Sequence, residues 1–288
     1  MVADRERIRE LRSVLLEAAQ TAARYLDAPK WEPSSGSEGA AEVANEETGS
    51  AGRWGESPVR TAHALTHALM DTVLTHVRAL ALLYVEIPPA MATATVARSI
   101  MEAGATAWWI MESGIGPRRR VARVTSERLR SAREAAKAII HLEGPVNPGD
   151  YSETEEQVRD YAARLGLMAA EGDPRIDGQV RPNSTDLISS LFETESALNG
   201  SQARLVYPVY SGVAHGLLYG IMQFLRPTEI AGEVRLTWQT DPHITDAVAS
   251  YTLAVMIAAM DRVLAVLGWD TTPWDRWKST LSEHFAES

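Results

Sequence analysis

The sequence predicts an all-α fold, a single multi-helix bundle of eight or nine helices that spans residues 1–288. Apolar residues recur at helical spacing through almost the whole chain, whereas only residues 233–239 have the alternating pattern of a strand. Hydrophobic residues make up 45% of the 288, which is enough for a sizeable core. We therefore expect one bundle with a small β-hairpin.

The first helix is predicted close to the N-terminus, and a disordered loop is predicted to follow it. The apolar stripe of this helix consists of Ile8, Leu11, Leu15, Ala18, Ala22 and Tyr25. Residues 29–57 are rich in Gly, Ser, Glu and Pro and show no period, so we expect them to be disordered. Ser57 is a favourable N-cap and Pro58 a favourable first-turn residue, and together they begin a helix that reaches about residue 86.

The remaining elements follow in order, separated by Gly- and Pro-rich breaks. The strand at 233–239 is expected to pair with the segment just before it in a hairpin. Pro208 should kink its helix or mark the true start of that helix. The predicted helices cover residues 89–113, 117–141, 151–172, 185–196, 202–225, 242–269 and 272–285.

Two apolar segments have so few charges that they could be considered as membrane spans. Residues 89–111 are long enough, but Arg98 and Glu102 near their middle would be costly in lipid. Residues 247–260 are too short. We expect no membrane association and assign both segments to buried helices. The chain has no cysteine, and its N-terminus lacks the continuous apolar stretch of a signal peptide, so a cytoplasmic location is expected.

One predicted helix reverses the charge of the chain, whose net charge is −10. Residues 118–137 hold eight basic side chains against Glu127 and Glu134. Because arginine binds phosphate with a two-pronged fork, this helix is a candidate site for tRNA or for a phosphorylated ligand. The alternative is a solvated face paired with acidic neighbours. The candidate phosphate- or RNA-binding residues are Arg119, Arg120, Arg123 and Arg130.

Arg128 is predicted to point inward or at the edge of a groove, because it shares one side of that helix with small and apolar residues. A buried arginine needs a carboxylate, and Glu102 lies one turn from Arg98 on the preceding helix. We expect Glu102 to pair with Arg98, with Arg128 or with both. Arg98 and Arg128 are candidate substrate-binding residues. The alternative is a purely structural network of ion pairs.

The segment 210–220, with sequence YSGVAHGLLYG, supplies the candidate catalytic residues. Tyr207, Ser211 and His215 recur every four residues, so their polar groups share a helix face that could transfer protons. Glycines at 212, 216 and 220 would allow close approach of a ligand or of another helix. The alternative is a hydrogen-bonded packing seam. The candidate catalytic residues are His215, Tyr210, Ser211 and Glu102, and the candidate substrate-binding tyrosines are Tyr207 and Tyr219.

Neither a metal nor a cofactor is expected. His63, His67 and Asp71 recur every four residues on one helix face, but this spacing is common by chance and no ExxH pair accompanies it. The chain also lacks a Gly-rich phosphate loop and the GxSxG and HExxH motifs.

Three sequence segments together resemble a group of uncharacterised all-helical actinobacterial proteins. The segments are TVARSIMEAGATAWWIM, RRRVARVTSERL and YSGVAHG, and the resemblance covers about residues 96–225. The matching residues are Arg98, Glu102, Arg128, Tyr210, Ser211, His215 and Gly216. The SxxxHG ending also resembles HEPN-type helical ribonuclease domains, which place an arginine shortly before the histidine. In this chain the preceding arginine is Arg204, eleven residues away.

The most concrete function that accommodates both the basic helix and a general base is an aminoacyl-tRNA-dependent acyl transferase. An Ala- and Arg-rich, actinobacterial-style composition makes specialised metabolism such as antibiotic biosynthesis its expected setting. The expected partners are a small-molecule substrate and tRNA, bound through helix 118–137. Two alternatives stay open: a non-catalytic binding or regulatory protein, and a HEPN-like ribonuclease. The sequence does not indicate an oligomeric state.

Overall fold

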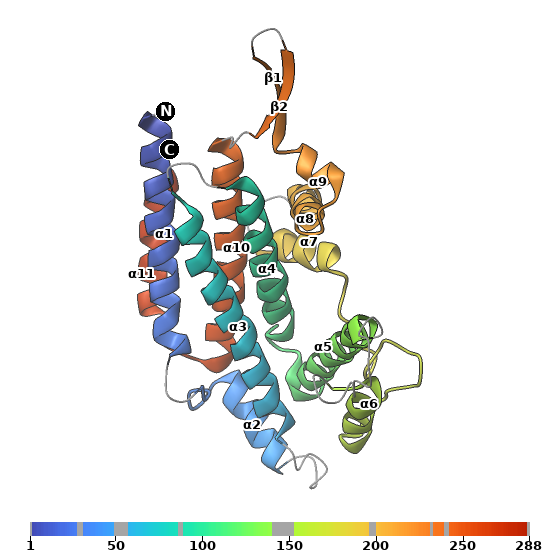
Figure 1. Ribbon diagram of the computed structural model, residues 1–288. Coiled ribbons are helices and arrows are strands. Elements are labelled where there is room, and N and C mark those ends of the chain that lie inside the picture. The colour runs from blue at the N-terminus through green and yellow to red at the C-terminus, as the bar shows by residue number, and fades with distance from the viewer. Residues whose placement is uncertain are drawn as a thin grey trace.

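A computed structural model describes residues 2–27, 31–48, 57–85, 89–139, 153–195, 200–230, 233–238 and 242–286 (Figure 1). It confirms the all-α prediction, because the described residues form eleven helices and one two-stranded hairpin. Long helices from both ends of the chain pack side by side as a bundle. These are α1 (Val2–Leu26), α3 (Pro58–Leu83), α4 (Ala90–Ile110), α10 (Pro242–Leu267) and α11 (Thr272–Ala286).

Helix α4 is the centre of the bundle, since it packs against α3 on one side and α10 on another. Its second half, from Ala103 to Ile110, is buried throughout. The approach of α10 is very close at Gly104, where an added Cβ would lie 2.5 Å from Cγ1 of Val255. A larger side chain at position 104 would therefore push α10 away. The helices α7 (Ser184–Glu195) and α8 (Gly200–Ala214) pack against another part of α4.

A second apolar cluster joins α5 (Gly116–Ile139) to α6 (Glu155–Arg164) beside the bundle (Figure 1). Val121 and Leu129 of α5 meet Val158 of α6 there. A capping box begins α6: the Thr154 hydroxyl accepts from the Gln157 backbone N–H, and the Gln157 side chain accepts from the Thr154 backbone N–H. This arrangement fixes the start of α6.

The prediction of a disordered loop over residues 29–57 is wrong for its described part. Residues Glu38–Thr48 form α2, which packs against α3, α5 and α10. Its composition is polar because two of its glutamates face inward, where Arg120 of α5 binds both Glu38 and Glu42. Residues 29, 30 and 49–56 of the predicted loop lie outside the described residues.

The predicted helix 202–225 is also interrupted. Gly216 has a positive φ of 67°, which ends α8, and the short helix α9 (Leu218–Met222) follows. Pro208 lies inside α8 rather than at its start. The hairpin prediction is confirmed: β1 (Leu225–Ile230) pairs antiparallel with β2 (Glu233–Trp238).

Helix α10 is the described helix that is long and apolar enough, by length and composition, to cross a membrane. Of its most apolar stretch, 67% is buried inside the structure, against α1, α3 and α4 among others. This burial is what a core helix of a bundle requires.

Candidate functional site

The basic side chains of α5 are almost all engaged in ion pairs. Seven of the eight bind a carboxylate within 3.0 Å. One of these carboxylates lies on α2 and two on α5 itself, and the other four lie just before α5 or in the segment 153–177. Arg119 is exposed and has no ion-pair partner in the described part of the chain. Most of α5 is therefore better described as a basic face paired with acidic neighbours than as a row of arginines free to bind phosphate.

Arg120 and Arg123 cannot contact a phosphate from solvent, so that prediction is wrong for both. The Arg120 side chain is 0% exposed, and its guanidinium binds Glu42, Glu38 and the backbone carbonyl of Ile110. Arg123 is buried over the ring of Trp109, and it binds Glu112 at 2.6 Å. The helical spacing of the sequence does not predict the burial of these two arginines, because a long arginine side chain can extend into a core that offers carboxylates.

Arg128 does not pair with Glu102. Its Nε donates to Glu153 at 2.8 Å, and its guanidinium stacks 4.3 Å from the ring centre of Tyr161 on α6. Arg128 is half-buried, and its guanidinium lies against Tyr161 of the α5–α6 cluster rather than beside Glu102 of α4.

Glu102 pairs with Arg98 at 3.1 Å, as the sequence predicts. The hydroxyl of Tyr207 on α8 also donates to the Glu102 carboxylate. Burial, followed by this hydrogen bond to a carboxylate, raises the pKa of Tyr207. The tyrosine is therefore held as a proton donor, and the group joins α8 to α4.

The remaining candidate catalytic residues do not form one site. His215 is exposed at the end of α8, and Tyr210 is buried in the core, where burial raises its pKa. Ser211 is half-buried one turn before His215. The glycine row explains the local packing: the ring of Tyr219 covers Gly212, and the backbone of α8 lies against Gly220. Gly212 and Gly220 therefore accommodate neighbouring parts of the chain, whereas Gly216 is exposed and ends α8.

We expect His215→Ala to change the free energy of unfolding by less than about 0.5 kcal/mol, because an exposed side chain is removed. Glu102→Gln should cost about 1–2 kcal/mol, since Arg98 loses a charged hydrogen-bond partner that is partly open to water. Urea denaturation of the two variants measures both values. A larger loss in His215→Ala than in Glu102→Gln would contradict the placement of the two residues.

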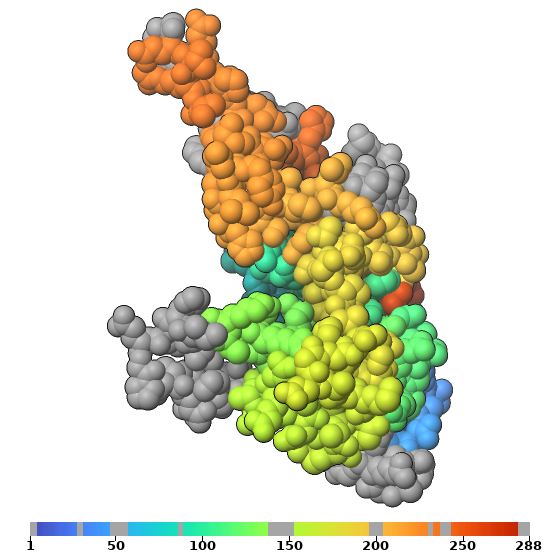
Figure 2. All heavy atoms as spheres, turned by 90° about the vertical axis from the view of Figure 1, so that its right-hand side faces the viewer, coloured from blue at the N-terminus to red at the C-terminus, as the bar shows by residue number. Residues whose placement is uncertain are grey.

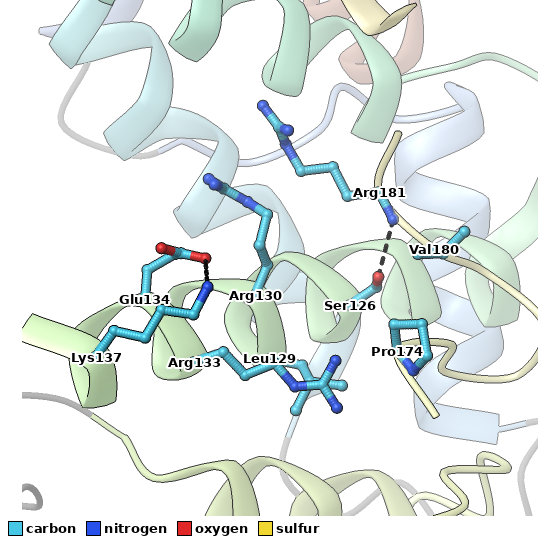
Figure 3. A pocket seen from close by; sticks show the side chains of 9 residues that line it. All are labelled: Ser126, Leu129, Arg130, Arg133, Glu134, Lys137, Pro174, Val180 and Arg181. Carbon is cyan, nitrogen blue, oxygen red and sulfur yellow. Dashed lines mark hydrogen bonds and ion pairs between the residues drawn. The ribbon is translucent and has the colours of Figure 1, made fainter. Parts of the chain in front are cut away.

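A cationic pocket of about 290 Å³ lies between α5 and the segment that follows α6 (Figure 3). Arg130, Arg133 and Lys137 line it from α5, and Arg181 lines it from the opposite segment. The backbone N–H of Arg181 donates to the Ser126 hydroxyl at 3.1 Å, which fastens this segment to α5 (Figure 3). The pocket therefore has two walls that are joined at one end.

Glu127 binds two of the arginines that line the pocket. It accepts from Arg130 at 2.7 Å and pairs with Arg181 at 2.9 Å, so one carboxylate serves two guanidinium groups. Arg181 also donates to the Thr106 hydroxyl of α4 at 3.1 Å. Burial is the main cause that lowers the pKa of Arg181, and the nearby charge of Arg130 lowers it further, while Glu127 raises it. An anion in the pocket would relieve the repulsion between the two arginines.

The ion pairs around the pocket leave an excess of two positive charges. Glu155 is shared between Arg133 and Arg159, and hydrogen bonds from these two arginines lower its pKa to about 2. Five cations thus share three carboxylates in this network, in a chain whose net charge is −10, and four of the five line the pocket while Arg159 does not. The cations are Arg130, Arg133, Lys137, Arg159 and Arg181, and the carboxylates are Glu127, Glu134 and Glu155.

Sequence reasoning identified Arg130 but missed the other pocket residues. Arg133 and Lys137 belong to the basic helix, and successive spacings of three residues from Arg130 to Arg133 and four from Arg133 to Lys137 place all three on one face. No sequence signal marked Arg181, because it lies in a loop 51 residues beyond Arg130.

No group of three or more potential metal ligands is present among the described residues. His63 is buried and its Nε2 lies 3.9 Å from Glu42, whereas Nε2 of His67 contacts the backbone carbonyl of Leu26 at 3.0 Å. The two histidines therefore serve separate packing contacts.

Comparison with known proteins gives no relative: no protein-family model, no curated protein and no solved structure matches the chain. The site must be interpreted from its own geometry.

Proposed function

We propose that the protein binds a small phosphate-bearing ligand in the pocket between α5 and the segment 174–181. The observation that carries the proposal is the excess of two positive charges around this pocket, which matches a phosphate dianion. Arginine forks favour phosphate oxygens, and a pocket of about 290 Å³ suits a ligand the size of a phosphate ester or a mononucleotide.

The accessible cations would make the first contacts. The Arg130 side chain is 46% exposed and Lys137 is more exposed still, so both can reach a ligand. Arg181 is buried and held by Glu127 and Thr106, so it would supply a fixed charge at the inner wall. Binding would require Lys137 to leave Glu134, which is an exposed pair of small energetic value.

Calorimetric titration at low salt, with inorganic phosphate and with a ribonucleoside 5′-monophosphate, tests the proposal. We expect one site per chain for each phosphate species. The double change Arg130→Gln and Lys137→Gln should weaken binding by roughly 10- to 100-fold, because two charge-assisted hydrogen bonds are removed.

Arg119→Gln is the matched control, because Arg119 is exposed on the same helix, pairs with no carboxylate among the described residues and does not line the pocket. It should leave binding within about twofold, since it removes charge but no contact. An absence of binding, or equal losses in the control and in the pocket variant, would refute the proposal.

A more specific function can be built on the same pocket. An aminoacyl-tRNA-dependent acyl transferase of specialised metabolism, in the cytoplasm, would use the same pocket for a terminal phosphate and would require tRNA on α5. Its support is the cationic excess and the exposed Arg119. Isolation of the native protein with its bound nucleic acid tests it: co-purifying tRNA that is lost in Arg119→Glu would support it, and protein free of RNA would refute it.

A further inference from the structure

A second cationic pocket, of about 240 Å³, lies where α1 packs against the C-terminal end of α3. Arg5, Arg9 and Arg12 line it from α1. Figure 1 places α1 on the opposite side of the bundle from α5 and α6, and the face shown in Figure 2 is formed mainly by α5–α9 and the hairpin. The second pocket is therefore separate from the one between α5 and the segment 174–181, and the two share no lining residue.

The three arginines lie on one face of α1, because they are spaced by four and then by three residues. All three are exposed, and Arg9 and Arg12 make no ion pair or hydrogen bond within the described part of the chain. By contrast Arg7, on another face of α1, is held by Glu10 at 2.9 Å and by Asp246 at 3.0 Å. Like charges one turn apart on a helix repel each other, so an anion between these arginines would stabilise this end of α1.

The rest of the pocket lining is apolar, and it consists of Ile8, Tyr84 and Val85. The Tyr84 hydroxyl donates to the backbone carbonyl of Thr245 at 2.6 Å inside the core, so the tyrosine can offer only its ring to the pocket. Val85 is 49% exposed, and Leu82, three residues earlier, is 64% exposed. The apolar surface of the pocket therefore continues along the end of α3.

We propose that this second pocket binds an anionic amphiphile, a carboxylate or phosphate monoester head on an alkyl or aryl tail. Arg9 and Arg12 are free to bind the head with charge-assisted hydrogen bonds, and an arginine fork fits both kinds of head group. The ring of Tyr84 and the side chain of Val85 cover the part of the tail next to the head. For a longer tail, the exposed surface of Leu82 adds apolar contact.

The occupant is a single dissolved molecule and not a lipid in a bilayer. The chain has a net charge of −10, which opposes its approach to an anionic membrane surface. A pocket of about 240 Å³ suits a head group with a short tail. Because the site shares no residue with the pocket beside α5, it stands or fails independently of the function proposed above.

Equilibrium dialysis with labelled octanoate at low salt tests the proposal. We expect one octanoate per chain at this site, and we expect acetate to compete roughly 10- to 100-fold less well, because it lacks the apolar tail. The double change Arg9→Gln with Arg12→Gln should weaken octanoate binding by roughly 10- to 100-fold, since two charge-assisted hydrogen bonds are removed. The matched control is Arg130→Gln with Lys137→Gln, which removes the same charge from the other pocket and should leave octanoate binding within about twofold.

Two further variants test the apolar part of the pocket. Val85→Asn should weaken octanoate binding by roughly tenfold and leave the weak competition by acetate unchanged. Val234→Asn, at an exposed valine of β2, should change neither. Circular dichroism of each variant checks that the helices are unchanged. An absence of octanoate binding, binding that ignores the double change Arg9→Gln with Arg12→Gln, equal binding of octanoate and acetate, or binding to phosphatidylglycerol vesicles without binding of dissolved octanoate would overturn the inference.

Discussion

Replacing Arg120 with methionine should lower the free energy of unfolding by about 3–5 kcal/mol. The guanidinium of Arg120 lies entirely out of water and holds Glu42, with Nε donating at 2.7 Å and Nη2 at 3.0 Å. Without the arginine, the buried Glu42 carboxylate has lost its compensating charge, and the carbonyl of Ile110 loses a donor at 2.7 Å. The loss of one partner of a buried pair costs much more than the pair itself contributes.

Urea denaturation measures this change as a shift of the midpoint at constant slope. Arg119→Met is the matched control, since it removes the same side chain from the adjacent, exposed position and should cost less than about 0.5 kcal/mol. The double variant Arg120→Met with Glu42→Gln should recover part of the loss, because the stranded charge is gone. Equal losses in Arg119→Met and Arg120→Met would contradict the burial of Arg120.

Acidification should destabilise the protein through His63. Burial is the main cause that lowers the pKa of His63 from 6.5 to about 4, and the positive charges of Arg120 and Arg60 add to it. Glu42 is 3.9 Å away but is already bound by Arg120, so it does not stabilise a protonated imidazole. Between pH 6.5 and 4 the unfolded chain binds a proton at this residue and the folded chain does not.

Stability therefore falls as the pH falls through this window, by about 3 kcal/mol in total. His63→Leu should remove this part of the pH dependence and cost little at pH 7, because Nε2 of His63 is buried with no hydrogen-bond partner in the described structure. The measurement is the urea midpoint of the parent, of His63→Leu and of His215→Leu at a series of pH values. His215→Leu is the control, because it replaces an exposed histidine. If the parent and His63→Leu lost the same stability between pH 6.5 and 4, this part of the pH dependence would not come from His63.

The features that the sequence predicted correctly depend on local spacing. Helical periodicity fixed the positions of most helices, and the alternation in 233–238 together with the preceding turn residues indicated the hairpin. The pair of Arg98 and Glu102 was predictable because residues four apart on a helix face each other. Local spacing does not predict the polar helix α2. Its composition is typical of a disordered loop, and Arg120, which binds its Glu42, lies 78 residues away in the sequence.

The candidate site was decided by contacts between distant segments. The sequence determined that α5 is basic, but the tertiary structure determined which cations are buried, which are paired and which line a pocket. Arg120 and Arg130 are the same residue type on one helix, yet one is enclosed by α2 and the other opens to a loop that brings Arg181. Likewise His215 lies on an apolar-looking segment, but Gly216 ends the helix there and leaves the ring exposed. Periodicity specifies which face of a helix a residue occupies, whereas burial and charge pairing depend on which other segment packs against that face.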